Sequence, residues 1–232
     1  MTADLDRFDV DPPYLYPDYV GTRLRAPLQA LVPLDLTLTE TTRPRHAADT
    51  IGATDHDLTS GHAGEPIGER IIVTGRLMDT EGRPLRGQAI EIWQANAAGR
   101  YRHALDQHRA PLDPNFTGEG RCLTDDDGGY RFVTIRPGAY PWRNHANAWR
   151  PAHIHFSLYG GGLASRLVTQ MYFPGDPLLS LDPIFNSISD TRAAARLVSN
   201  FDIAATEPAW ALAFRFDIVL RGTGSTPMET DA

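Results

Sequence analysis

The chain has 232 residues, of which 41% are hydrophobic, and it carries a formal net charge of −7. This length allows one large β domain or two small ones, and the negative charge disfavours a nucleic-acid-binding protein, which usually presents a basic field. A single cysteine, Cys122, excludes an internal disulfide framework, and no apolar run reaches the roughly 18 residues of a membrane helix. The acidic N-terminus lacks the apolar core of a signal peptide, so we expect a cytoplasmic protein in which Cys122 is a small buried residue.

Residues 1–65 form an N-terminal segment without strand alternation and rich in proline. Tyr14, Tyr16 and Tyr19 lie close together in it, and one helical turn is predicted near residues 26–31. An arm of this length with aromatic side chains to bury is expected to wrap over its own domain or over a partner subunit. A disordered tail is the alternative.

From residue 70 onwards, apolar and polar residues alternate with the period of β-strands. Strands are predicted over residues 71–77 and 88–94, and a turn at 79–84 suggests that they form a hairpin. Further strands are predicted over residues 121–124, 130–135, 152–158, 166–173 and 212–220.

Residues 189–198 are the one convincing helix, with Ser189 or Asp190 as its N-cap. About seven strands, one helix and many turns predict an all-β fold, a β-sandwich with long loops. We place this domain at residues 66–224, after the N-terminal arm, and assign residues 225–232 to a short polar C-terminal tail.

The most informative stretch of the chain is residues 138–156, which ends in a His-x-His pattern on a predicted strand. His153 and His155 are two residues apart and therefore share one face of the strand, while Ile154 and Phe156 point into the opposite layer. Two imidazoles side by side on a rigid element are a natural half of a metal site. The alternative is a metal-free histidine pair that faces solvent or a polar pocket.

Two tyrosines upstream are candidate partners of this pair: Tyr140 lies thirteen residues before His153, and Tyr101 lies thirty-nine residues before Tyr140. Imidazole suits iron, zinc and copper, and a phenolate is a hard anionic oxygen ligand. Two phenolates would neutralise two charges of Fe(III) and keep it ferric, as a Lewis acid. Spacing alone does not decide whether the tyrosines bind a metal, because most tyrosines in a β-sandwich simply pack in the core.

Long segments over most of the chain resemble the intradiol ring-cleavage dioxygenase family: PIGERIIVTGRLMD, IEIWQANAAGRYRH, APLDPNFTGEGRCLTDDDG, TIRPGAYPWRNHANAWRPAHIHFSLYG, LVTQMYFPGDPL and FRFDIVLRG. The order Tyr…Tyr…His-x-His matches the iron ligands of that family. The resemblance implies that Tyr101, Tyr140, His153 and His155 bind one non-haem Fe(III) per chain. The family fold is a β-sandwich, in agreement with the predicted strands.

The reaction that the resemblance implies is cleavage of protocatechuate (3,4-dihydroxybenzoate) with O2 to 3-carboxy-cis,cis-muconate, in the β-ketoadipate pathway of aromatic hydrocarbon catabolism. Tyr140 would leave the metal when the catechol binds and accept a catechol proton. Arg150 would face the site and stabilise the carbanion-like substrate. Trp142 and Gln170 match residues of the substrate pocket. Without the resemblance, a structural ion pair, core packing and a polar strand face would account for Arg150, Trp142 and Gln170 respectively.

Other readings of the His-x-His pattern are weaker. A cupin-type site expects a glutamate a few residues later, which is absent here, and a zinc hydrolase needs a general base and an open position. Two alternatives stay within the resembled family: a non-catalytic structural subunit, and a catechol or hydroxyquinol 1,2-dioxygenase. Those homodimeric relatives have a helical N-terminal dimerisation region, whereas this arm is irregular. We therefore expect an α subunit as partner in an αβ hetero-oligomer.

Overall fold

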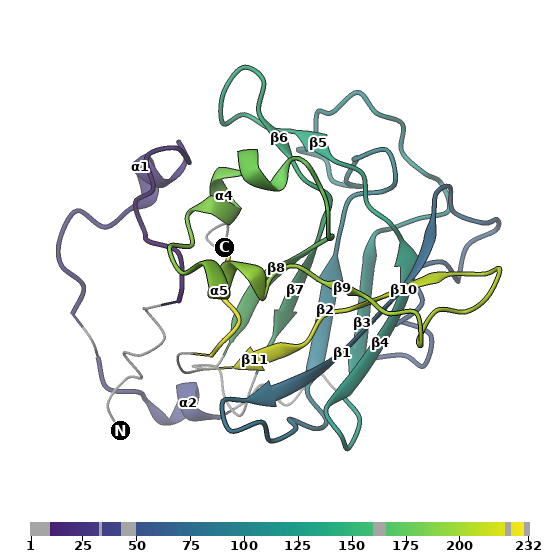
Figure 1. Ribbon diagram of the computed structural model, residues 1–232, viewed down its shortest axis with the longest axis horizontal. Coiled ribbons are helices and arrows are strands. Elements are labelled where there is room, and N and C mark those ends of the chain that lie inside the picture. The colour runs from purple at the N-terminus through teal and green to yellow at the C-terminus, as the bar shows by residue number, and fades with distance from the viewer. Residues whose placement is uncertain (1–9, 33, 43–49, 160–165, 221–223, 230–232) are drawn as a thin grey trace.

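The computed structural model describes residues 10–32, 34–42, 50–159, 166–220 and 224–229. Within these ranges the chain is built mainly of strands, which form two stacked sheets with short helices to one side (Figure 1). One hydrophobic core draws buried side chains from both sheets, among them Ile71 of the first sheet and Ile90 of the second. The predicted β-sandwich is confirmed.

The first sheet is centred on the long strand β1. Its order is β11-β1-β10-β9, and β4 pairs with the other edge of β1. The pairing of β1 with β4 is antiparallel, while β10 and β11 run parallel to successive halves of β1. The strands of this sheet are β1 (Arg70–Asp79), β4 (Gly129–Ile135), β9 (Asn200–Phe201), β10 (Leu212–Arg215) and β11 (Ile218–Leu220).

The second sheet has the order β3-β2-β7-β8, and all of its pairings are antiparallel. Every residue of β7 and β8 is buried, because one face of this sheet covers the core and the other lies beneath the site described below. Its strands are β2 (Ala89–Trp93), β3 (Glu119–Leu123), β7 (His153–Leu158) and β8 (Leu167–Tyr172). The strands predicted at 121–124, 130–135, 152–158 and 166–173 thus correspond to β3, β4, β7 and β8.

The hairpin predicted from residues 71–77 and 88–94 is wrong, because β1 and β2 belong to different sheets. After β1 the chain makes a single bridge between Met78 and Pro84 and then crosses to the other layer. Both strands carry an apolar face, and a sandwich buries the two faces against each other across its core rather than side by side.

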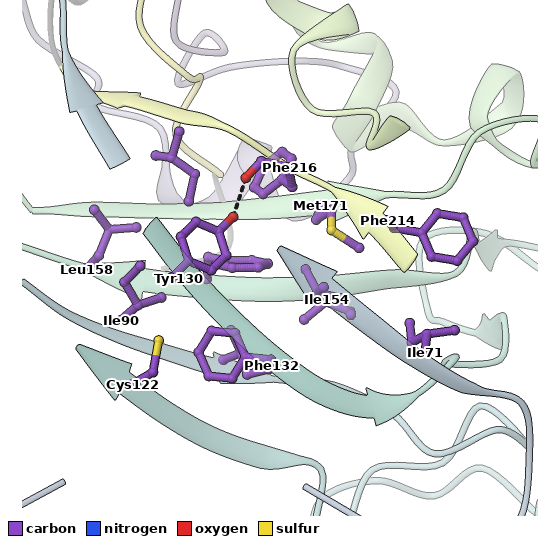
Figure 2. Packing of buried hydrophobic residues seen from close by; sticks show 14 of the residues in the cluster. Ile71, Ile90, Cys122, Tyr130, Phe132, Ile154, Leu158, Met171, Phe214 and Phe216 are labelled. Atoms are coloured by element: carbon purple, nitrogen blue, oxygen red, sulfur yellow. Dashed lines mark hydrogen bonds between the residues drawn. The ribbon is translucent and has the colours of Figure 1, made fainter. Parts of the chain in front are cut away.

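The single strand predicted over residues 212–220 is interrupted between β10 and β11. At the interruption the Phe216 carbonyl approaches β1 so closely that a Cβ on Gly75 would lie 1.9 Å from its oxygen. The buried Tyr130 hydroxyl donates to the same carbonyl (Figure 2), and the Asp217 carboxylate accepts from the Arg76 N–H at 2.9 Å. These side-chain contacts replace the regular ladder at this point.

Large side chains fill the space between the sheets (Figure 2). Phe132 from β4 packs edge to face against Phe156 from β7, with ring centroids 6.4 Å apart. Cys122 is buried in this core, as predicted, and burial raises the pKa of its thiol to about 12. Ile154 is fully buried in the same cluster.

Two predicted helical segments differ from the observed ones. Helix α5 (Thr191–Ala195) is shorter than residues 189–198; Asp190 caps it, accepting from the Arg192 N–H at 2.8 Å. It ends early because the chain after Ala195 pairs with β8, where the Tyr172 N–H donates to the Leu197 carbonyl at 2.8 Å.

In the arm, the helical turn predicted at residues 26–31 is wrong. Helix α1 (Thr22–Arg25) lies just before it, and Ala26 is extended (φ −62°, ψ 138°) because it precedes Pro27. The remaining short elements are α2 (Leu38–Thr41), β5 (Tyr140–Pro141), β6 (Trp149–Arg150), the 3₁₀ turn η3 (Leu179–Leu181) and α4 (Pro183–Asn186).

Candidate metal centre

Strand β7 carries the two histidines of the His-x-His pattern. It lies between β2 and β8, so both of its edges are paired. His153 and His155 lie on one face with ring centroids 4.8 Å apart, whereas Ile154 and Phe156 enter the core on the opposite face. The predicted orientation of these four residues is confirmed.

The two candidate tyrosines approach this face from separate parts of the chain. The Tyr140 Oη lies 3.3 Å from His153 Nε2, and the Tyr101 Oη lies 3.2 Å from His155 Nε2. The two phenol rings meet edge to face with centroids 5.4 Å apart. Tyr140 is in β5, while Tyr101 is in the loop after β2, where the Asp106 carboxylate accepts from its backbone N–H at 2.8 Å.

A glycine allows these two segments to come together. Gly99 has φ 75°, and a Cβ there would lie 2.1 Å from the Ala139 carbonyl oxygen. The backbone before Tyr101 therefore lies directly against the backbone before Tyr140. A side chain at position 99 would prevent this close approach.

The hydrogen bond at Nδ1 defines the tautomer of each of the two histidines. His153 Nδ1 lies 2.7 Å from the Pro151 carbonyl oxygen, and His155 Nδ1 lies 2.8 Å from the Glu229 carboxylate. Both partners only accept, so each Nδ1 carries the proton and each Nε2 presents a lone pair. Burial, and then the charge of Arg150, hold the pKa of His153 well below its usual value, which keeps that imidazole neutral.

The four converging groups have the composition of a cation site. Metal–ligand bonds of roughly 2 Å place neighbouring ligand atoms about 3 Å apart, as the two Oη–Nε2 pairs are here. Burial, and then the neighbouring Tyr140, raise the pKa of Tyr101 well above its usual value. A bound cation reverses this effect by stabilising the phenolate. The residues present therefore fit a metal with nitrogen and hard oxygen ligands.

A buried charge network lies next to these groups. Arg150 in β6 is 2% exposed, and its Nε is 3.2 Å from an Asp182 carboxylate oxygen. The guanidinium also donates to Gln170 Oε1 and lies 3.2 Å from the Tyr172 hydroxyl. Its centre lies 5.5 Å from the centroid of the Trp142 ring. The structure thus brings Arg150, Gln170 and Trp142 together and adds an ion pair with Asp182.

Two buried donors in this region have no hydrogen-bond partner within the described part of the chain: Gln170 Nε2 and Trp142 Nε1. An unmade buried hydrogen bond costs about 1–3 kcal/mol, so such donors indicate a place for a bound molecule.

Sequence reasoning missed three residues of this region, Asp182, Tyr172 and Glu229. Asp182 and Glu229 lie far from the His-x-His pattern along the chain, whereas Tyr172 lies only two residues after Gln170, and the period of the strand places both side chains on one face. The Trp93 ring stacks on the His155 ring, with centroids 4.7 Å apart and planes 5° from parallel.

Two family models match the sequence: one described as Dioxygenase, over residues 41–222, and one described as Protocatechuate 3,4-dioxygenase beta subunit N terminal, over residues 6–37. A "Protocatechuate 3,4-dioxygenase beta chain" from Burkholderia cepacia is 57% identical over 220 residues, which cover 94% of this chain and 93% of that one. The chain belongs to the intradiol dioxygenase family. It is therefore an enzyme, an oxidoreductase of the dioxygenase type, in an iron-dependent family.

Two further relatives of this intradiol dioxygenase bear on its fold and assembly. A "Protocatechuate 3,4-dioxygenase alpha chain" from Pseudomonas putida is 30% identical over 161 residues, covering 68% of this chain and 75% of that one. The crystal structure of 3-chlorocatechol 1,2-dioxygenase from Rhodococcus opacus 1CP superposes with a TM-score of 0.56 at 23% identity, covering 73% of this chain and 66% of that one. The second likeness shows the fold alone. Among the described residues no helix is both long and apolar enough to cross a membrane.

Proposed function

We propose that this chain is the catalytic subunit of a protocatechuate 3,4-dioxygenase. It cleaves protocatechuate with O2 to 3-carboxy-cis,cis-muconate, as a step of aromatic catabolism. The high identity to the Burkholderia cepacia chain over nearly the full length supports this substrate, and so does the matching N-terminal family. A cytoplasmic location is part of the proposal and accords with the free, buried Cys122.

One Fe(III) is held by Tyr101, Tyr140, His153 and His155. The observation that carries this assignment is that the Nε2 of each histidine lies within 3.3 Å of a tyrosine oxygen. When bound, ferric iron would supply a Lewis acid that favours the deprotonated form of the catechol, which is the electron-rich form that reacts with O2.

The surrounding residues hold protons and position the ring. Tyr140 accepts a catechol proton at its Oη when the substrate takes its place. The guanidinium of Arg150 is fixed by Asp182 and Gln170, so its positive charge is already oriented toward an electron-rich substrate. The unpartnered Gln170 Nε2 and the Trp142 indole complete the pocket wall.

The visible absorption spectrum of the purified enzyme tests iron and ligands together. We expect a tyrosinate-to-Fe(III) band that shifts on anaerobic addition of protocatechuate. Turnover of protocatechuate is then compared with that of catechol and hydroxyquinol. A colourless protein after supply of Fe(III) would contradict the metal assignment, and faster turnover of catechol or hydroxyquinol would contradict the substrate.

The proposed partner is a homologous α chain in an αβ hetero-oligomer. The arm assigned to residues 1–65 precedes the sandwich domain of 66–224 and the tail of 225–232. Its described part exposes several large apolar side chains: Leu24, Leu28, Val32, Leu34 and Leu38 are each more than three-quarters exposed. Such a set is typical of a surface that another chain covers.

Coexpression with an α chain and size-exclusion chromatography test this partner. Leu28→Asp, at a side chain that is 99% exposed, is expected to weaken assembly with α. Ile203→Asp, which alters a 72% exposed apolar residue outside the arm, is the matched control. Equal assembly of both variants would exclude the arm as the α-binding surface.

A further inference from the structure

The C-terminal tail, described for residues 225–229, is docked on the sandwich. The Thr226 N–H donates to the Val219 carbonyl at 2.9 Å, and the Val219 N–H donates to Thr226 Oγ1 at 3.0 Å. Further along, the Glu229 N–H donates to the Val168 carbonyl at 2.7 Å. The tail therefore bridges β11 and β8 and brings Glu229 next to the candidate metal centre.

This docking delivers a carboxylate to a metal-site histidine. Glu229 is 9% exposed, and its Oε2 lies 2.8 Å from His155 Nδ1. The stacked Trp93 ring covers one face of the same imidazole, and its Nε2 faces the Tyr101 hydroxyl. A carboxylate on the outer nitrogen of a metal-binding histidine fixes the orientation of the ring and increases its donor strength.

We propose that Glu229 is a positioning residue that sets the donor strength and orientation of His155 toward the metal. The inference rests on the proposed function, because it concerns the same site. Glu229 itself lies outside the part of the chain that the Dioxygenase family model matches, because that match ends at residue 222.

The two histidines differ in the partner that accepts the hydrogen bond from Nδ1. His153 Nδ1 donates to the neutral carbonyl of Pro151, two residues earlier in the chain. His155 Nδ1 donates to an anionic group that is 74 residues away. Charge-assisted hydrogen bonds are roughly twice as strong as neutral ones, so His155 is the better electron donor of the pair. Its donor strength therefore depends on the Glu229 carboxylate of the tail.

The N-terminal arm supports this arrangement. Asp11 Oδ1 accepts from the Met228 N–H at 2.8 Å, directly before Glu229, and the neighbouring Val10 is buried. The arm at Asp11 thus contacts the tail next to Glu229, and this contact helps to place the carboxylate.

The experiment compares Glu229→Gln, Glu229→Ala and Thr226→Val in the complete enzyme with its α partner. Iron content, the rate of iron loss to a chelator, the tyrosinate-to-Fe(III) band and the thermal midpoint are measured for each. Glutamine can still accept from Nδ1 but lacks the charge. We expect Glu229→Gln to retain iron while its band moves to longer wavelength, since a weaker His155 leaves the metal more electron-poor.

Glu229→Ala is expected to lose iron about 10- to 100-fold faster, in line with the usual effect of removing such a partner. Thr226→Val removes only the tail hydroxyl that binds Val219, so it should lower the thermal midpoint without moving the band. Unchanged bands and iron loss in both Glu229 variants would overturn the inference and leave Glu229 as a tail anchor. If Glu229→Ala does not assemble, the comparison of Glu229→Gln with Thr226→Val decides. A wild-type enzyme without a tyrosinate band would instead contradict the proposed function.

Discussion

At the scale of single residues, the site combines two phenols, two imidazoles and a buried guanidinium. Each of the two phenol oxygens lies within 3.3 Å of a histidine Nε2, and burial disfavours the anionic form of Tyr101. Arg150 adds a buried positive charge that is balanced by Asp182. A bound cation would favour loss of the phenol protons and would balance the charge of the resulting phenolates.

The unequal roles of Tyr140 and His155 give the first prediction. Tyr140→Phe leaves three ligands and is expected to keep most of the iron while slowing the binding of protocatechuate, because the phenolate that accepts a proton is gone. His155→Ala is expected to lose iron. Iron analysis and stopped-flow absorption check both variants, and a His155→Ala enzyme with full iron content would contradict the ligand assignment.

A second prediction concerns the buried ion pair. Asp182 is 0% exposed and also caps α4, where it accepts from the Ile184 N–H at 3.2 Å. Asp182→Asn can keep the cap but leaves Arg150 without its counter-charge, which costs about 3–5 kcal/mol of unfolding free energy. Urea denaturation measures this loss. Asp190→Asn, at the exposed cap of α5, is the control and should change stability far less.

The thiol of Cys122 gives a prediction on pH. Burial raises its pKa from 9.0 to about 12, so the native thiol stays protonated where an unfolded thiol ionises. Its contribution to stability is complete below pH 9 and is lost as the pH rises toward 12. Native protein should therefore react with an aromatic disulfide reagent at pH 9 far more slowly than urea-unfolded protein. Equal rates would show that the thiol is accessible.

At the scale of elements, the central strand β1 depends on a close backbone approach. A Cβ at Gly75 would lie 1.9 Å from the Phe216 carbonyl oxygen and 2.6 Å from the Tyr130 hydroxyl. That carbonyl accepts the Tyr130 hydrogen bond at the interruption between β10 and β11. The parallel pairing of both halves of β1 thus requires a residue without a side chain at this position.

Gly75→Ala is accordingly expected to destabilise the protein by about 2–4 kcal/mol, since backbone rather than a flexible side chain has to move. Gly224→Ala is the matched control, because no atom of the described residues lies within 4 Å of a Cβ there. Thermal and urea unfolding of the two variants measure the difference. A Gly75→Ala protein as stable as Gly224→Ala would show that β10 and β11 can move away from β1 at little cost.

At the scale of the whole molecule, the sequence patterns were sufficient where a local period carries the information. The alternation in residues 152–158 predicted both the strand and the shared face of His153 and His155. Pairing partners are not local, and this is why the hairpin of residues 71–94 and the single strand of 212–220 were wrong. The same limit applies to Glu229, because the tail has no period and its partner is 74 residues away.

The contact between arm and site gives the last prediction. Asn144 accepts from the Val20 N–H at 2.8 Å and donates to the Asp18 carbonyl at 2.7 Å. Between these two bonds, Tyr19 packs against the pocket residue Trp142 with ring centroids 5.3 Å apart. One side chain therefore holds the arm against the wall of the proposed substrate pocket.

Asn144→Ala removes both hydrogen bonds and is expected to release this part of the arm, so that Trp142 loses its support. We expect KM for protocatechuate to rise several-fold, the iron content to stay unchanged, and cleavage by a protease in the arm to become faster. Asn147→Ala, an exposed position on the same loop, is the control. A loss of iron in Asn144→Ala would show that the arm supports the proposed metal centre itself rather than the pocket wall. Unchanged kinetics with faster proteolysis would instead show that the arm contact has no effect on substrate binding.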